Sequence, residues 1–72
     1  MNSKEIKELR GKLLLSQVEF AKKLRVSVIT VSSWENRRSK PNKKATLRRL
    51  KRLQVRVENA ELRRKLKLVG LN

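Results

Sequence analysis

The sequence contains no cysteine and no histidine among its 72 residues. Without these side chains it cannot form a disulfide or a typical zinc site, and chemical catalysis would depend on serine, lysine and six carboxylates. Two glycines are too few for a loop that cradles a phosphate group. We therefore expect no enzyme, no cofactor and no bound metal. The lack of cysteine also fits a reducing cytoplasm, which is the expected location.

Long hydrophobic runs are also missing from this chain. The longest purely aliphatic run covers residues 13–15, far short of the roughly 20 apolar residues of a membrane span. No change in composition separates two cores, so we expect a single soluble domain over residues 1–72 and no membrane partner. A core of this size supplies only about 3–5 kcal/mol, so close helix packing or oligomerisation must stabilise it.

Basic residues are abundant, with 21 Lys and Arg against six acidic residues and a formal charge of +15. Fourteen of these bases and only two acids lie in residues 37–72. Such a charge favours a polyanionic partner, nucleic acid before an acidic membrane. Apolar residues recur through the basic half at helical spacings, which favours basic helices over a disordered tail. These residues are Leu47, Leu50, Leu53, Val57, Leu62, Leu66 and Val69.

Three short polar motifs mark expected helix starts in the first half of the chain. Asn2 and Glu5 have the spacing of a capping box, and Ser16 and Glu19 repeat it. Ser27 can cap a third helix. Apolar residues at helical spacing follow these starts. We therefore expect helices over residues 3–13, 17–24 and 28–35.

The second half is expected to form two further helices, after a loop that contains the only proline. The first covers about residues 43–53. The next residues could continue this helix or break it, because Val55 and Val57 are β-branched but no glycine marks a turn. Asn59 offers a cap for a last helix over about 59–68. The expected fold is all-α, a compact bundle of about five helices, with residues 55–72 as a basic C-terminal helical extension.

The second and third expected helices are separated by only three residues, 25–27. Two short helices joined in this way cannot pack antiparallel and must cross steeply, as in a helix-turn-helix. Across residues 17–36 the apolar positions are those that interlock two such helices, with the small Ala21 at their closest approach. The two aromatic residues, Phe20 and Trp34, lie on the predicted inner faces, so we assign both to the core rather than to the stacking of nucleic-acid bases.

This pattern resembles the Cro and phage-repressor family over about residues 4–53. The likeness extends through residues 6–10, 15–17, 33–36 and 40–41. The resemblance implies a lambda-repressor-like bundle of four or five helices that binds DNA as a dimer or in tandem. It also implies that the third helix enters the major groove with its N-terminal end nearest the bases.

Carried over onto this sequence, the resemblance implies two sets of DNA-binding residues. The candidates for reading bases are Ser27, Val28, Ile29, Ser32 and Ser33. The candidates for binding phosphates are Gln17, Arg10, Asn36, Arg37, Arg38, Lys40 and Lys43. Long side chains that read bases by paired hydrogen bonds are missing from the centre of this helix, but aliphatic side chains can contact thymine methyl groups. The alternative for Val28 and Ile29 is that they complete the core or contact another protein.

The sequence departs from the family pattern at two turns. Arg25 and Arg37 stand where the family commonly has glycine, because the chain there tends to adopt a left-handed conformation. That conformation costs other residues about 1–2 kcal/mol. We therefore expect these turns to be strained or slightly reshaped. The loss of stability would be exchanged for two additional cations that can bind phosphates.

The charge and the resemblance together predict a sequence-specific transcriptional regulator that binds double-stranded DNA and represses by occluding a promoter. Such a protein would be nucleoid-associated when bound to DNA. Two alternatives stay open. One is an antitoxin that binds a toxin protein and represses its own operon, because residues 41–53 are similar to the corresponding part of helix-turn-helix antitoxins. The other is a non-specific basic nucleic-acid-binding protein. A homodimer is expected if Leu62, Leu66 and Val69 form a self-complementary stripe.

Overall fold

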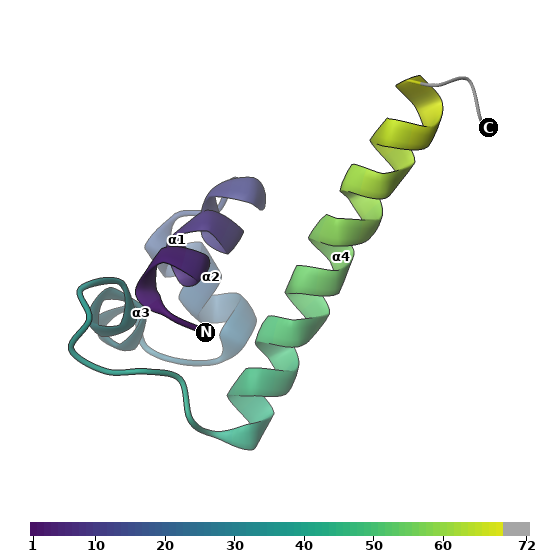
Figure 1. Ribbon diagram of the computed structural model, residues 1–72. Helices are drawn as coiled ribbons and strands as arrows, with labels where there is room; N and C mark the ends of the chain where they lie inside the picture. The colour runs from purple at the N-terminus through teal and green to yellow at the C-terminus, as the bar shows by residue number, and fades with distance from the viewer. Residues whose placement is uncertain (69–72) are drawn as a thin grey trace.

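The computed structural model describes residues 1–68. These residues contain four α-helices joined by short turns and one loop. They are α1 (Ser3–Lys12), α2 (Gln17–Leu24), α3 (Val28–Glu35) and α4 (Lys44–Leu68). The three short helices form one group, and α4 lies beside this group and extends beyond it (Figure 1). The expected all-α fold is confirmed, and α2 and α3 have the bounds that the sequence predicts.

The starts of the first three helices follow from local hydrogen bonds at their caps. The Asn2 side chain accepts a bond from the Glu5 amide at 2.9 Å, and the Glu5 carboxylate accepts one from the Asn2 amide at 3.1 Å. Ser16 and Glu19 form the same reciprocal pair at the start of α2. The Ser27 hydroxyl accepts a bond from a backbone amide of α3. All three caps predicted from the sequence are confirmed.

The first three helices also end in the same way, each with a residue in the left-handed region. Leu14, Arg25 and Arg37 have φ values of 56°, 59° and 62°. The amide of each donates to the carbonyl three residues back, and the next amide donates to the carbonyl five residues back. This is the hydrogen-bond pattern of the Schellman motif, which favours glycine at the left-handed position. The left-handed conformation expected at Arg25 and Arg37 is confirmed, whereas the one at Leu14 was not predicted.

The last 25 described residues form one helix, α4. The prediction of two helices, over 43–53 and 59–68, was wrong. The segment has no glycine or proline, and a β-branched residue costs a helix only a few tenths of a kcal/mol. Val57 also packs against the core, as does Leu53. This packing holds α4 straight through the predicted break, so residues 1–68 contain four helices and Asn59 lies inside α4.

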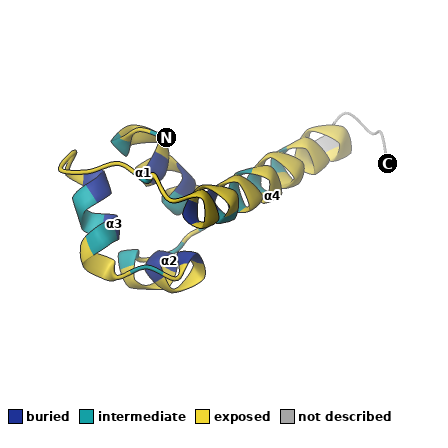
Figure 2. Cartoon of the chain, turned by 90° about the horizontal axis from the view of Figure 1, so that it is seen from below, coloured by how far each residue is buried: buried dark blue, intermediate teal, exposed yellow. Residues whose placement is uncertain are grey.

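The core lies between the helices and contains both aromatic residues. Its buried apolar side chains are Ile6, Leu9, Phe20, Ala21, Leu24, Val31, Trp34 and Leu50. Helices α1 and α2 each pack against both α3 and α4 and so lie between them (Figures 1 and 2). Beyond Leu50, no residue up to Lys67 is fully buried, although Leu53 and Val57 still pack against the core and Glu61 pairs with Lys12 of α1. The last described turns of α4 project from the group (Figures 1 and 2). None of the four helices in residues 1–68 has both the length and the apolar character needed to cross a membrane.

Candidate nucleic-acid interface

The outer face of α3 carries the candidate base-reading residues. Ile29 is 76% exposed and Val28 is 38% exposed, so neither completes the core. Ser27 is exposed as well, and Ser32 and Ser33 are half-buried. The first turn of α3 therefore presents two aliphatic side chains to solvent beside its cap.

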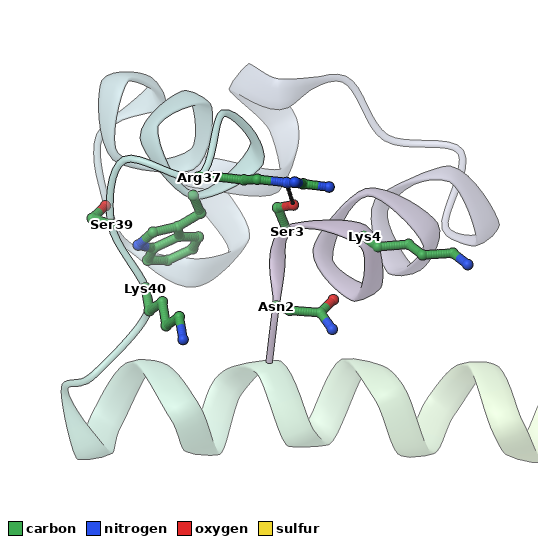
Figure 3. A pocket seen from close by; sticks show the side chains of 7 residues that line it. Asn2, Ser3, Lys4, Arg37, Ser39 and Lys40 are labelled. Carbon is green, nitrogen blue, oxygen red and sulfur yellow. Dashed lines mark hydrogen bonds between the residues drawn. The ribbon is translucent and has the colours of Figure 1, made fainter.

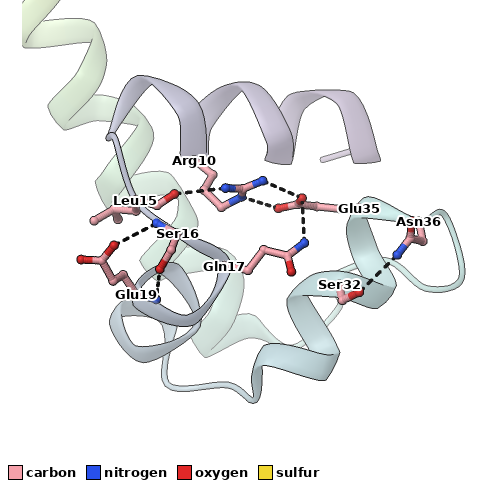
Figure 4. Close-up of polar contacts among 8 residues, drawn as sticks. All are labelled: Arg10, Leu15, Ser16, Gln17, Glu19, Ser32, Glu35 and Asn36. Carbon is pink, nitrogen blue, oxygen red and sulfur yellow. Dashed lines mark hydrogen bonds and ion pairs between the residues drawn. The ribbon is translucent and has the colours of Figure 1, made fainter.

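The serine hydroxyls of α3 already have partners inside the protein. The Ser32 hydroxyl accepts a bond from the Asn36 side-chain amide at 3.2 Å (Figure 4). The Ser39 hydroxyl donates to Ser33 at 3.1 Å. A hydroxyl can donate one hydrogen bond and accept two, so both serines keep capacity for a further contact. Among the candidate readers, Ile29 is therefore the one most available to a ligand.

A buried carboxylate, Glu35, joins the first three helices. It lies at the end of α3 and is only 5% exposed. The Arg10 guanidinium donates to both of its oxygens, at 2.7 and 3.0 Å, and also to the Leu15 carbonyl at 3.1 Å. The Gln17 side-chain amide donates to the same carboxylate at 3.1 Å (Figure 4). This network fixes the start of α2 and the end of α3 relative to α1.

The hydrogen bonds decide the charge state of Glu35. Burial opposes ionisation, but the bonds from Arg10 and Gln17 outweigh burial and hold the pKa of the Glu35 carboxyl below its ordinary value. The bond to Glu35 likewise raises the pKa of Arg10. Both groups are therefore charged at neutral pH and form a closed ion pair within the fold.

Glu35 was missed by the reasoning from sequence, and it changes the interpretation of Arg10. Arg10 was expected to bind a phosphate, but three of its nitrogen atoms donate to protein groups. A signal was present in the sequence. Glu35 ends a helix with no basic residue in its last turn, where the helix dipole disfavours a negative charge. A carboxylate in that position requires a cation from elsewhere in the fold.

The remaining phosphate candidates lie in the loop after α3 and are exposed. They are Asn36, Arg37, Arg38, Lys40 and Lys43. None of the four cations among them forms an ion pair within residues 1–68. Gln17 is half-buried at the first position of α2, where a helix leaves its backbone amides without intrahelical partners. The Gln17 bond to Glu35 brings that helix start next to α3 and its loop.

The N-terminus of α1 supports this loop. The Arg37 Nε donates to the Ser3 hydroxyl at 3.4 Å (Figure 3). These two residues and Trp34, together with Asn2, Lys4, Ser39 and Lys40, line a cavity of about 390 Å³. The cationic loop is thus held against the body of the protein on the side where α3 lies (Figure 1).

The geometry agrees with the comparison against known families. A family model described as helix-turn-helix matches residues 6–55, which is more than half of the chain and extends from α1 into α4. Neither the curated proteins nor the solved structures compared with the chain include a match. The chain therefore belongs to the helix-turn-helix family of DNA-binding regulators, in the group that contains Cro and the phage repressors.

Proposed function

We propose that the protein is a transcriptional repressor that reads the major groove with the N-terminal half of α3. The observation that carries this proposal is the exposure of Ile29, next to Val28, in the first turn of the helix. Aliphatic side chains in this position can contact the methyl groups of thymine. Ser27 at the cap of this helix, and Ser32 and Ser33 within it, can add hydrogen bonds to base edges. Bound in this way, the protein would occlude a promoter.

The phosphate contacts in this proposal come from both ends of the helix pair. The backbone amides at Gln17 would bind one phosphate, because a helix N-terminus attracts anions. Asn36, Arg37, Arg38, Lys40 and Lys43 would bind the flanking backbone. Such contacts position a protein on DNA without reading its sequence. Arg10 is left out of this set, because its role is to hold Glu35 and so to orient α3.

The test is selection of bound sites from random duplex DNA, followed by binding of variants to a panel of the selected sites. Ile29→Ala should change the preference at one thymine-bearing position by about 1–3 kcal/mol. Lys40→Ala should weaken binding to all sequences nearly equally. Val18→Ala is a matched control, since Val18 is exposed on α2.

Two outcomes would contradict this proposal. If folded variants at Ile29, Val28, Ser32 and Ser33 all keep the original preference, then α3 is not the reader. If the selected site binds less than about 10³-fold more tightly than random DNA at the same salt, the protein is a non-specific nucleic-acid-binding protein. A thermal melt of each variant shows first that it is folded.

We also propose that the protein is a homodimer through the projecting part of α4. Leu62 is 55% exposed and Leu66 is 40% exposed, and both lie on one side of the helix with Val55. Val69, the third residue expected in this stripe, lies outside the described residues. The double variant Leu62→Gln/Leu66→Gln should sediment as a monomer and bind palindromic sites without cooperativity. Val18→Gln, on α2, should sediment like the unmodified protein.

An antitoxin is a second candidate function, and one surface feature favours it. A groove of about 440 Å³ lies between the turn after α1 and α4, lined by residues that include Leu13, Leu14, Val57 and Ala60. Leu14 is 90% exposed at its edge. A toxin protein could bury this apolar surface. Co-expression with the product of the neighbouring gene tests the idea, and a stoichiometric complex that Leu14→Gln breaks would support it. If no complex forms, repression alone stands.

A further inference from the structure

The exposed surface of α4 carries a row of arginines that the proposed binding mode does not use. Arg52, Arg56 and Arg63 are all exposed. At 3.6 residues per turn, their positions fall within roughly 40° of one another around the helix. Together with Val55, Asn59 and Ala60 they line a shallow groove of about 400 Å³. The row lies about a quarter of a turn from the apolar stripe of Leu62 and Leu66.

Within the part of the chain that the structure describes, no acidic side chain pairs with this arginine row. Within residues 1–68, none of the three arginines forms an ion pair or a side-chain hydrogen bond. The two acidic residues of α4 are Glu58 and Glu61, which fall on other sides of the helix by the same count. Glu61 pairs with Lys12 of α1 at 2.8 Å. Like charges one turn apart destabilise a helix. A bound external anion would relieve this repulsion.

Helix α4, which carries the row, lies across the domain from α3. Helices α1 and α2 separate α3 from α4, and α4 runs away from α3 as it leaves the loop (Figures 1 and 2). The chain is 44 Å along its longest dimension and about 20 Å across. A duplex against the outer face of α3 therefore leaves Arg56 and Arg63 facing solvent.

We propose that this arginine row binds the phosphate backbone of a second DNA segment, so that the protein bridges two duplexes. This inference rests on the proposed binding of a first duplex by α3. The guanidinium group matches phosphate oxygens with two parallel hydrogen bonds. The arginines are spaced by roughly 6 and 10 Å along the helix axis. This suits a uniform polyanion such as a DNA duplex, which carries a charge about every 1.7 Å.

The experiment measures capture of one duplex by another. A duplex with the selected site is fixed to beads, the full-length protein is added, and capture of a second, fluorescent duplex is measured. Arg52→Gln/Arg56→Gln/Arg63→Gln should lower capture at least about tenfold. Its affinity for a single duplex should change less than about threefold, since α3 and its loop are intact. Lys51→Gln/Arg64→Gln/Lys65→Gln removes the same charge from other sides of α4 and should keep capture.

Several results would overturn the bridging proposal. Equal loss of capture in both triple variants would show an effect of net charge alone. A parallel loss of single-duplex affinity would place the arginines on the first duplex. Capture lost in Leu62→Gln/Leu66→Gln but kept in the arginine variant would show bridging by a dimer. If the arginine row bound poly-L-glutamate in place of a second duplex, its partner would be an acidic protein rather than DNA. Failure to bind even one duplex would instead contradict the proposed function.

Discussion

Glu35 shows how one side chain orients a DNA-binding surface without facing it. Its carboxylate is buried at the end of α3 and accepts bonds from Arg10 of α1 and Gln17 of α2. An ion pair with a buried partner contributes little net stability over apolar packing, but removal of one partner is costly because the other charge is left unpaired. The network therefore acts mainly on geometry, since it fixes α3 relative to α1 and α2 and, in the proposed complex, sets the angle at which α3 meets DNA.

Glu35→Gln should destabilise the protein and reduce its sensitivity to acid. The folded state lowers the pKa of Glu35, so its stabilising effect is complete above the ordinary carboxyl pKa of about 4.3 and is lost as pH falls through the lower folded value. We expect a loss of about 2–3 kcal/mol at pH 7, since Arg10 keeps some contact with water. Urea unfolding from pH 7 to pH 3 measures both effects.

The control for this prediction is Glu8→Gln, which changes an exposed carboxylate on α1. It should leave stability at pH 7 within about 0.5 kcal/mol of the original. If Glu35→Gln lost as much stability on acidification as the unmodified protein, the paired carboxylate would not be Glu35.

At the scale of the elements, the three short helices end in a conformation that suits none of the residues in it. Leu14, Arg25 and Arg37 each occupy the left-handed position of a Schellman motif. Hydrogen bonds to the last carbonyls hold them there, since those carbonyls would otherwise lack partners. The arginines place positive charge at the C-terminal ends of α2 and α3, beside the surface proposed to bind DNA, whereas Leu14 is 90% exposed and contributes almost no buried surface.

Leu14→Gly should stabilise the protein, because glycine adopts the left-handed region without strain and Leu14 is 90% exposed. Glycine also makes the unfolded chain more flexible, which offsets part of the relieved strain. We therefore expect the free energy of unfolding to rise by about 0.5–1 kcal/mol. For a domain of this size the melting temperature should rise by about 2–8 °C. Leu14→Ala keeps the strain and should not raise it. A fall in melting temperature for the glycine variant would show that Leu14 is not strained.

Helix α4 combines two environments in one element. Its first turns bury Leu50 in the core, and its last turns are exposed up to Lys67. A helix this long gains most of its stability from tertiary packing rather than from intrinsic propensity. The packed half therefore supports the projecting half, and the exposed surface of α4 carries the apolar stripe and the arginine row on adjacent sides.

For the whole molecule, the charge of +15 acts in opposite directions on folding and on binding. Self-repulsion destabilises the free protein, and salt screens it. Binding to DNA releases counterions, and salt opposes that release. The same change in ionic strength should therefore stabilise the fold while it weakens the complex.

This contrast is testable with one salt series. The free protein should melt at a higher temperature as sodium chloride rises from 50 to about 300 mM. The logarithm of DNA affinity should fall against the logarithm of salt with a slope of about −4 per chain. This value follows if Arg37, Arg38, Lys40 and Lys43 each neutralise one phosphate. Lys40→Ala should make the slope shallower by about 1. A slope shallower than −2 would contradict the proposed set of contacts.

Features with local causes were predictable from the sequence. The caps at Asn2, Ser16 and Ser27 depend on residues three apart, and the crossing of α2 and α3 depends on a link of three residues. The apolar period placed Phe20 and Trp34 in the core. The resemblance to a known family then located the outer face of α3, and the exposure of Ile29 agrees with that location.

The remaining features depend on residues that meet only after the chain has packed. Arg10 and Glu35 are 25 residues apart, so no local pattern pairs them, and only their contact reveals that Arg10 is held inside the fold. Packing of Leu53 and Val57 made α4 continuous where propensity alone left a break open. The same packing fixed which side of α4 faces solvent. Sequence alone thus determined the first three helices and their caps through short-range bonds, whereas tertiary contacts decided the ion pair, the long helix and the exposure of its arginine row.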